Sequence, residues 1–214
     1  MRRIRFSRSA VTVSAVLIGL LSSGGMMLAG SYAAFSSTTA NANNNWSAGT
    51  VAISDDDTGS AMFTTGAVGT GQVSGTLKPG QTIANCVRVT YNGSLPSTVK
   101  LYATSPVTET APNGTGLLAY LHIKVEEGTA GDFGCANFAG ASTIWDSSTH
   151  PGAASDLLSV FPTSYAGGIS SGLASWSSGT YRVYRFTMTL DGSTPDTSQG
   201  ATATATFNWQ AQNA

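Results

Sequence analysis

The side chains with the most chemical potential are two histidines, His122 and His150. Together with Glu126, Glu127 or Asp146 they would supply the nitrogen and oxygen ligands of a zinc site. The chain has no His-Glu-x-x-His motif, which would place two histidines on one helix face. His122 falls on the outward face of an expected strand, and His150 precedes a proline in an expected turn. We therefore expect surface histidines, with no catalytic residue, no metal and no cofactor. A two-histidine site completed by one of these acids is the alternative, but no spacing argues for it.

Two cysteines, Cys86 and Cys135, are the remaining strong nucleophiles. Both lie after a segment that indicates export, and exported proteins meet an oxidising compartment in which a single pair forms a disulfide. A disulfide would remove both thiols from catalysis. The alternative is two free, buried thiols.

Three consecutive acids, Asp55, Asp56 and Asp57, resemble a calcium loop only superficially. The ligands of such loops alternate with other residues, so we expect a solvated turn. The four tryptophans could line a carbohydrate platform, but we expect them in the core or at sheet edges. These tryptophans are Trp46, Trp145, Trp176 and Trp209.

The elements expected to hold these side chains are β-strands. Apolar and polar residues alternate in residues 86–91, 117–126, 181–190 and 201–209, and Gly, Pro, Asn and Asp separate the strands. The positions expected to face inward are Val87, Val89, Tyr91, Ala119, Leu121, Ile123, Val125, Tyr184, Phe186, Met188, Leu190, Ala201, Ala203, Ala205, Phe207 and Trp209. We expect one short helix over residues 155–161 and a long connection over 165–179. The sequence predicts an all-β, antiparallel jelly roll or related β-sandwich in a single domain.

The N-terminus has the order of a secretory signal peptide. Four arginines occupy the first eight residues, an apolar stretch covers residues 10–21, and small residues end at Ala34. We expect cleavage between Ala34 and Phe35, so that residues 1–34 are removed. An uncleaved membrane anchor is the alternative, and a twin-arginine signal is a weak one.

Cleavage changes the charge of the protein. Four of the ten Lys and Arg residues leave with the signal peptide, whereas all eleven acids stay, which gives the remaining chain a net charge of −5. Such a chain has no basic surface with which to bind nucleic acid or an anionic membrane. We expect membrane contact only through an uncleaved signal peptide.

Four motifs resemble those of one protein family. SYAAF at residues 31–35 is followed by WSAGTV at 46–51, then by LKPG at 77–80 with NGS at 92–94, and the chain closes with TATATFNWQAQN at 202–213. In order and spacing these motifs are similar to the TasA/camelysin family, whose precursors are cut by a SipW-type signal peptidase. Residues 107–179 show no match, and the two cysteines depart from the cysteine-free members.

The resemblance implies a secreted jelly-roll protein that assembles into extracellular fibres of a biofilm matrix or cell surface. Its partners would be further copies of itself, head to tail, and the signal peptidase during export. Camelysin-like relatives have been described as metalloproteases, so the alternative is a monomeric secreted metalloprotease or a surface adhesion module.

The physical route to a fibre is the stretch that becomes the N-terminus after cleavage, residues 35–45, here called the N-terminal segment. It contains no charged side chain, Gly or Pro, so it can extend and add to a sheet edge of a neighbouring copy by donor-strand exchange. Its residues are Phe35, Ser36, Ser37, Thr38, Thr39, Ala40, Asn41, Ala42, Asn43, Asn44 and Asn45. We expect an assembly segment over residues 35–50 and the folded domain over 51–214. The alternatives are a disordered tail, a strand that pairs within its own domain, or a cross-β fibre.

Overall fold

A computed structural model describes residues 47–146 and 156–213, and Ala48–Ala214 forms one compact unit. The described residues contain ten strands and two single turns of 3-10 helix. The predicted all-β antiparallel sandwich is confirmed. The signal peptide, the Ala34–Phe35 cleavage site, the N-terminal segment, Trp46 and His150 lie outside the described residues.

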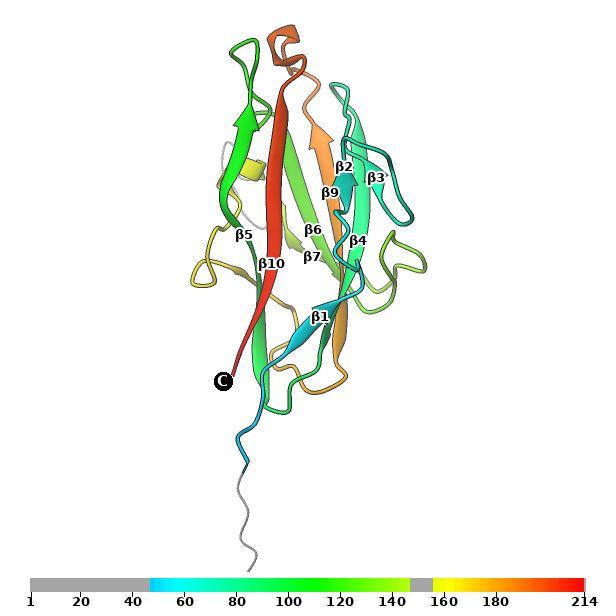
Figure 1. Ribbon diagram of the computed structural model, residues 1–214, viewed down its shortest axis with the longest axis vertical. Coiled ribbons are helices and arrows are strands. Elements are labelled where there is room, and N and C mark those ends of the chain that lie inside the picture. Colours follow the sequence, from blue (N-terminus) through cyan, green and yellow to red (C-terminus); the bar gives the residue numbers. More distant parts are fainter. Residues whose placement is uncertain (1–46, 147–155, 214) are drawn as a thin grey trace, which may run out of the picture. The chain divides into compact units, whose positions relative to one another are not determined.

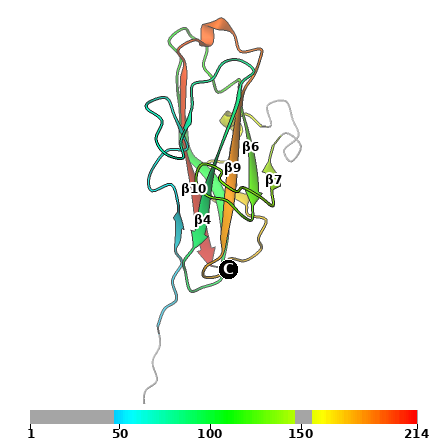
Figure 2. The ribbon, with the colours of Figure 1, turned by 90° about the vertical axis from the view of Figure 1, so that its right-hand side faces the viewer.

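The larger sheet has five strands in the order β1-β4-β9-β6-β7. Its bounds are β1 Ile53–Asp55, β4 Thr82–Tyr91, β9 Tyr181–Leu190, β6 Leu121–Gly128 and β7 Ser142–Trp145. All four pairings in this sheet are antiparallel. The long strands β4, β9 and β6 run side by side in Figures 1 and 2.

The smaller sheet has three strands in the order β10-β5-β8, with bounds β10 Thr202–Asn213, β5 Ser97–Thr110 and β8 Ile169–Ser170. β10 and β5 are antiparallel over almost their whole length, from Thr202 opposite Thr110 to Asn213 opposite Ser97. A separate pair, β2 Phe63–Thr64 and β3 Val73–Ser74, is parallel and only two residues long.

Alternating side chains from both sheets fill the core. Val87, Val89 and Tyr91 on β4 are at most 1 % exposed, and Tyr184 and Phe186 on β9 are equally buried, as their alternation predicts. Phe207 on β10 packs with its ring centroid 4.4 Å from that of Phe186, which joins the two sheets.

Three boundaries differ from the sequence prediction. Residues 117–120 form a turn closed by the Tyr120 N–H on the Leu117 carbonyl (2.8 Å), so the strand starts at Leu121 and Ala119 is exposed instead of facing inward. The helix expected over residues 155–161 is only the 3-10 turn Leu158–Val160, because the chain before it is extended against β6, where the Ile123 N–H donates to the Asp156 carbonyl (2.7 Å); Ser155 is outside the described residues. The last strand continues past Trp209 to Asn213.

The connection expected over residues 165–179 also contains structure. Trp176 is fully buried there, and its backbone exchanges hydrogen bonds with Ser97 (3.1 and 2.8 Å). This segment covers the edge of β5 that faces away from β10. Of the residues that the structure describes, none belongs to a helix long and apolar enough to cross a membrane.

Candidate functional site

β10 is the long unpaired edge of the sandwich. Its twelve residues pair with β5 on one side, and no strand of the described residues pairs with its other side. The other edge strands, β1, β7 and β8, have at most four residues each. Proteins usually shorten or cover such edges because unpaired backbone groups recruit another strand. A long open edge therefore marks β10 as a candidate interaction site.

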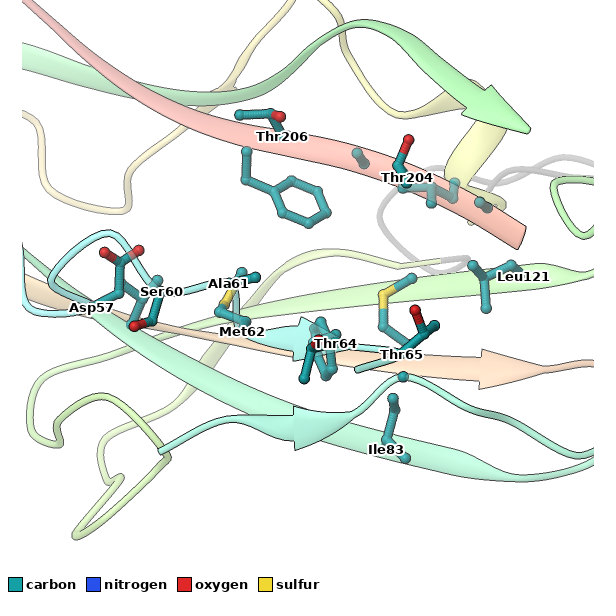
Figure 3. Close-up of a pocket in the computed structure, with 18 of the residues that line it drawn as sticks. Asp57, Ser60, Ala61, Met62, Thr64, Thr65, Ile83, Leu121, Thr204 and Thr206 are labelled. Carbon is teal, nitrogen blue, oxygen red and sulfur yellow. The ribbon is translucent and has the colours of Figure 1, made fainter. Parts of the chain in front are cut away.

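A groove runs along this open edge, with a volume of about 740 Å³. One wall is β10 from Thr202 to Trp209, and the other is the chain from Asp55 to Thr65, which includes β2. Figure 3 looks into the groove, with Thr204 and Thr206 on one side and Met62 and Thr64 on the other. We call this hollow the β10 groove.

The floor of the β10 groove is apolar. It is formed by side chains from three adjacent strands of the larger sheet and one from the loop before β4. These side chains are Ile83, Val87, Met188, Leu121 and Leu77.

The groove exists because the smaller sheet has too few strands to cover the larger one. Along the first half of β10 the inward side chains are the small ones of Ala203 and Ala205, which leave space that the next strand of a complete sheet would fill; the larger Phe207 and Trp209 follow further along the strand. The inward alternation of β10 was predicted, but its role as a groove wall was not.

Asn85 holds the second wall in place. It is fully buried on β4, and its amide nitrogen donates to the carbonyls of Met62 (2.7 Å) and Gly71 (2.8 Å). These two bonds attach the β2–β3 segment to the larger sheet. Buried polar groups that are satisfied in this way specify one arrangement of the chain.

The predicted disulfide between Cys86 and Cys135 is confirmed, and it supports the same wall from outside. It fastens residues 129–141, the cysteine loop, to β4. Gly134 of this loop lies so close to Gly71 that an added Cβ would be 2.9 Å from the Gly71 Cα. The β2–β3 segment and the cysteine loop are therefore in backbone contact.

The three consecutive acids divide into two roles. The Asp56 carboxylate accepts hydrogen bonds from the N–H groups of Arg88 and Phe133, each 2.8 Å long, and so joins β4 to the cysteine loop. Asp55 and Asp57 instead line the β10 groove, at the end where Trp209 lies. Burial, and after it the charges of Asp57 and Asp56, raises the pKa of Asp55. The predicted solvated turn is thus only partly correct.

The opposite end of the groove continues into a second hollow of about 510 Å³, which shares Thr202 and Ala203 with the first. The connection between β9 and β10 lines it, and Asp196 is the acid there. We call this the upper end of the groove and the Asp55–Asp57 end the lower end, as they stand in Figure 1.

The histidine that the structure describes lies between two aspartates. His122 Nδ1 lies 2.9 Å from Asp156 Oδ1, and its Nε2 lies 3.4 Å from Asp191 Oδ2. Hydrogen bonds from Ser193, followed by that with His122, lower the pKa of Asp191. Within residues 47–146 and 156–213, no three His, Cys, Asp or Glu side chains are grouped to hold a metal ion.

The other candidate ligands also have partners. Glu126 contacts Arg185 Nη2 at 2.6 Å and Lys124 Nζ at 3.1 Å, and Glu127 accepts a hydrogen bond from Arg182 Nε at 3.1 Å. Asp146 also has an interaction partner. Trp145 and Trp176 are buried, as expected, so they form no exposed carbohydrate platform.

One catalytic pattern escaped the sequence reading. Residues 168–172 read Gly-Ile-Ser-Ser-Gly, which matches the Gly-x-Ser-x-Gly form of a hydrolase nucleophile. That motif requires its serine on a sharp turn between a strand and a helix, but Ser170 is in β8, paired with Lys100. The motif is therefore an ordinary strand sequence here.

The chain matches no model of a known protein family, and no curated protein sequence matches it.

Proposed function

We propose that this protein is a secreted structural subunit that polymerises into extracellular fibres, in which the N-terminal segment of each subunit occupies the β10 groove of the next. The observation that carries the proposal is the open edge of β10 above an apolar floor. A strand added there would pair with β10 and cover the floor at the same time.

The length of the N-terminal segment fits the groove. Residues 202–209 of β10 line it, and eight residues of strand span about 27 Å. The eleven residues of the N-terminal segment extend over about 37 Å, so eight can pair with β10 while three remain to reach the subunit that donates them.

The composition of the segment fits as well. Thr, Ser, Asn and Ala carry no charge into the groove, and the absence of Pro leaves every backbone N–H available for pairing. Covering the floor removes apolar surface from water at about 25 cal/mol per Å², which adds to the pairing hydrogen bonds.

Donation in one direction gives an open polymer. The donor and the acceptor are different surfaces of the same chain, so each contact leaves another donor and another acceptor free. In the precursor the signal peptide holds the segment at the membrane. Cleavage then releases the segment, and the disulfide suits an oxidising compartment outside the cytosol. A biofilm matrix or a cell surface would be the site of assembly.

Deletion of residues 35–45 from the cleaved chain tests the proposal. The unsubstituted chain should give fibres by negative-stain microscopy, and the deletion variant should elute as a monomer in size-exclusion chromatography. A sharper variant is Ala40→Pro, which keeps the length but removes one pairing N–H, with Ala40→Ser as its matched control. Fibres that are unchanged in the deletion variant would rule out the donor-strand route.

A further inference from the structure

The two ends of the β10 groove differ in charge. At the lower end two acids line the groove, the exposed Asp55 and the half-buried Asp57, whereas the upper end has only the exposed Asp196. None of the ion pairs between described residues involves Asp55 or Asp57. The lower end therefore holds two carboxylates near an apolar cleft without a cation beside them.

The N-terminal segment brings one charge, and it lies at its tip. Residues 35–45 include no Lys, Arg, Asp or Glu, so cleavage leaves the α-ammonium group of Phe35 as the only charge of the segment. Phe35 also carries the only aromatic ring of the segment. At the lower end of the groove, two aromatic side chains, Phe207 and Trp209, line the wall beside the acids.

We propose, on the basis of the function proposed above, that the N-terminal segment enters the next subunit antiparallel to β10, with its α-ammonium group beside Asp55 and Asp57. The Phe35 ring then packs against Phe207 and Trp209, in the edge-to-face or tilted contacts that aromatic pairs favour. Residues 35–42 lie opposite residues 209–202 of β10. The partner that the acidic end recognises is thus the newly cut N-terminus of another copy.

The path of the chain supports this direction. Thr50 is hydrogen-bonded to Ser94 in the turn between β4 and β5, and β10 ends beside the same turn because Asn213 pairs with Ser97. The described chain therefore enters the domain at its lower end, and a segment inserted into another copy is joined to its own domain there. Antiparallel insertion places residue 45 at the upper end of the acceptor, so the lower end of one subunit meets the upper end of the next. This contact can repeat along a line.

The opposite direction gives a different assembly. A segment running parallel to β10 would bring the lower ends of two subunits together, which is not a head-to-tail contact. It is also the direction in which a segment would enter the groove of its own domain, since both β10 and the segment would then run towards the lower end. The charge at the lower end thus favours exchange between copies over self-insertion.

Signal-peptide cleavage acquires a second role in this arrangement. In the precursor the nitrogen of Phe35 is a neutral amide within the chain, and residue 34 extends beyond it. The acidic end then has no cation to bind. Removal of the signal peptide both frees the segment and creates the charge that the groove recognises.

Two pairs of cysteine substitutions, introduced in the cleaved full-length chain, test the direction. Ser36→Cys with Ser60→Cys joins the tip of the segment to the lower end, and Ser36→Cys with Thr202→Cys joins it to the upper end. After mild oxidation of assembled protein, the first pair should give a ladder of covalent oligomers on a non-reducing gel, and the second should not.

Every other result contradicts antiparallel insertion. A ladder from the Thr202 pair means parallel insertion, a cross-linked monomer means self-insertion, and fibres without cross-links in either pair place the segment elsewhere. If the unsubstituted chain forms no fibres at all, the proposed function fails together with this inference. If it forms fibres that lack the expected cross-link, only this inference fails, so the two failures are distinguishable.

Neutralisation of the acids tests the charge. Asp55→Asn with Asp57→Asn keeps the oxygen of residue 57 that accepts the Gly59 N–H (2.7 Å), and Asp196→Asn is the matched control at the upper end. At low salt the double variant should elongate fibres about tenfold more slowly, and added salt should reduce the difference. Equal elongation rates in the double variant and the control would overturn the role of the ammonium group.

Discussion

Replacement of Asn85 by aspartate tests whether the second wall of the β10 groove depends on one buried amide. The Asn85 side chain is fully buried, and both of its N–H bonds go to backbone carbonyls of the β2–β3 segment. Asn85→Asp replaces only the amide nitrogen of the side chain by an oxygen, but it removes both N–H donors. The Met62 carbonyl still accepts a hydrogen bond from the Val73 N–H (3.0 Å) in the variant. The larger energetic penalty therefore comes from the Gly71 carbonyl, which loses its hydrogen bond from Asn85.

The size of the loss follows from these contacts. An unsatisfied buried carbonyl costs about 1–3 kcal/mol, and the introduced carboxyl must be buried as well, facing carbonyl oxygens. We expect a loss of about 4 kcal/mol in the free energy of unfolding at pH 7. The pKa of the introduced carboxyl is raised in the folded state, so its protonated form is the better tolerated one. The loss should therefore shrink as the pH falls towards 4 and grow as the pH rises.

Urea unfolding followed by tryptophan fluorescence measures this loss, in the Ala40→Pro background so that assembly does not interfere. Asn113→Asp is the matched control, because the Asn113 amide also donates to a backbone carbonyl, that of Gln199 (2.9 Å), but in an exposed loop. The control should change stability by less than about 0.5 kcal/mol. A loss below about 1 kcal/mol for Asn85→Asp, or a loss independent of pH, would refute the reasoning.

Three further predictions concern the folded domain. Replacing both Cys86 and Cys135 by alanine should lower the free energy of unfolding by about 4 kcal/mol, since the crosslink closes a separation of 49 residues; an unchanged melting temperature would contradict this. Tyr91→Phe removes a buried hydroxyl that donates to the Leu95 carbonyl and lies 2.8 Å from the Ser97 hydroxyl, and it should cost about 1–2 kcal/mol by urea unfolding. Burial acts to raise the pKa of Glu126, but hydrogen bonds from Arg185 and Lys124 outweigh it and lower the pKa. The ion pair is thus present at neutral pH and is lost as the pH falls below the ordinary range of a glutamate. Glu126→Gln should therefore flatten the acid limb of the curve of stability against pH, and an unchanged acid limb would contradict this prediction.

The sequence predicted the strands whose pattern is local. Alternation alone identified the faces of β9 and most of β4, and it identified β10 except for its last four residues. It failed at residues 117–120, where Ala119 continued the apolar alternation but a turn had already formed. Alternation cannot report such a turn, because the competing hydrogen bond from Tyr120 to Leu117 uses only backbone atoms.

The candidate site was less accessible to sequence reasoning. The sequence predicts the N-terminal segment as a donor, and this stays a prediction. The acceptor that we propose for it depends on which strands are neighbours, and that is set by long-range pairing. Nothing local marks Ala203 and Ala205 as groove residues, or Asp55 and Asp57 as the acids of its lower end. The alternation of Asp55 and Asp57 around Asp56 was the one available signal, since residues two apart share a face of an extended chain.

Amide hydrogen exchange of β10 tests the central claim most directly. It compares fibres of the cleaved chain with the unassembled Ala40→Pro variant, and it follows peptides that cover residues 202–209. If the N-terminal segment of a neighbour pairs with β10, the amides on its open edge should exchange at least about tenfold more slowly in the fibre, because each gains a hydrogen bond. Fibres in which residues 202–209 exchange as fast as in the monomer, with protection gained at another edge, would contradict the account.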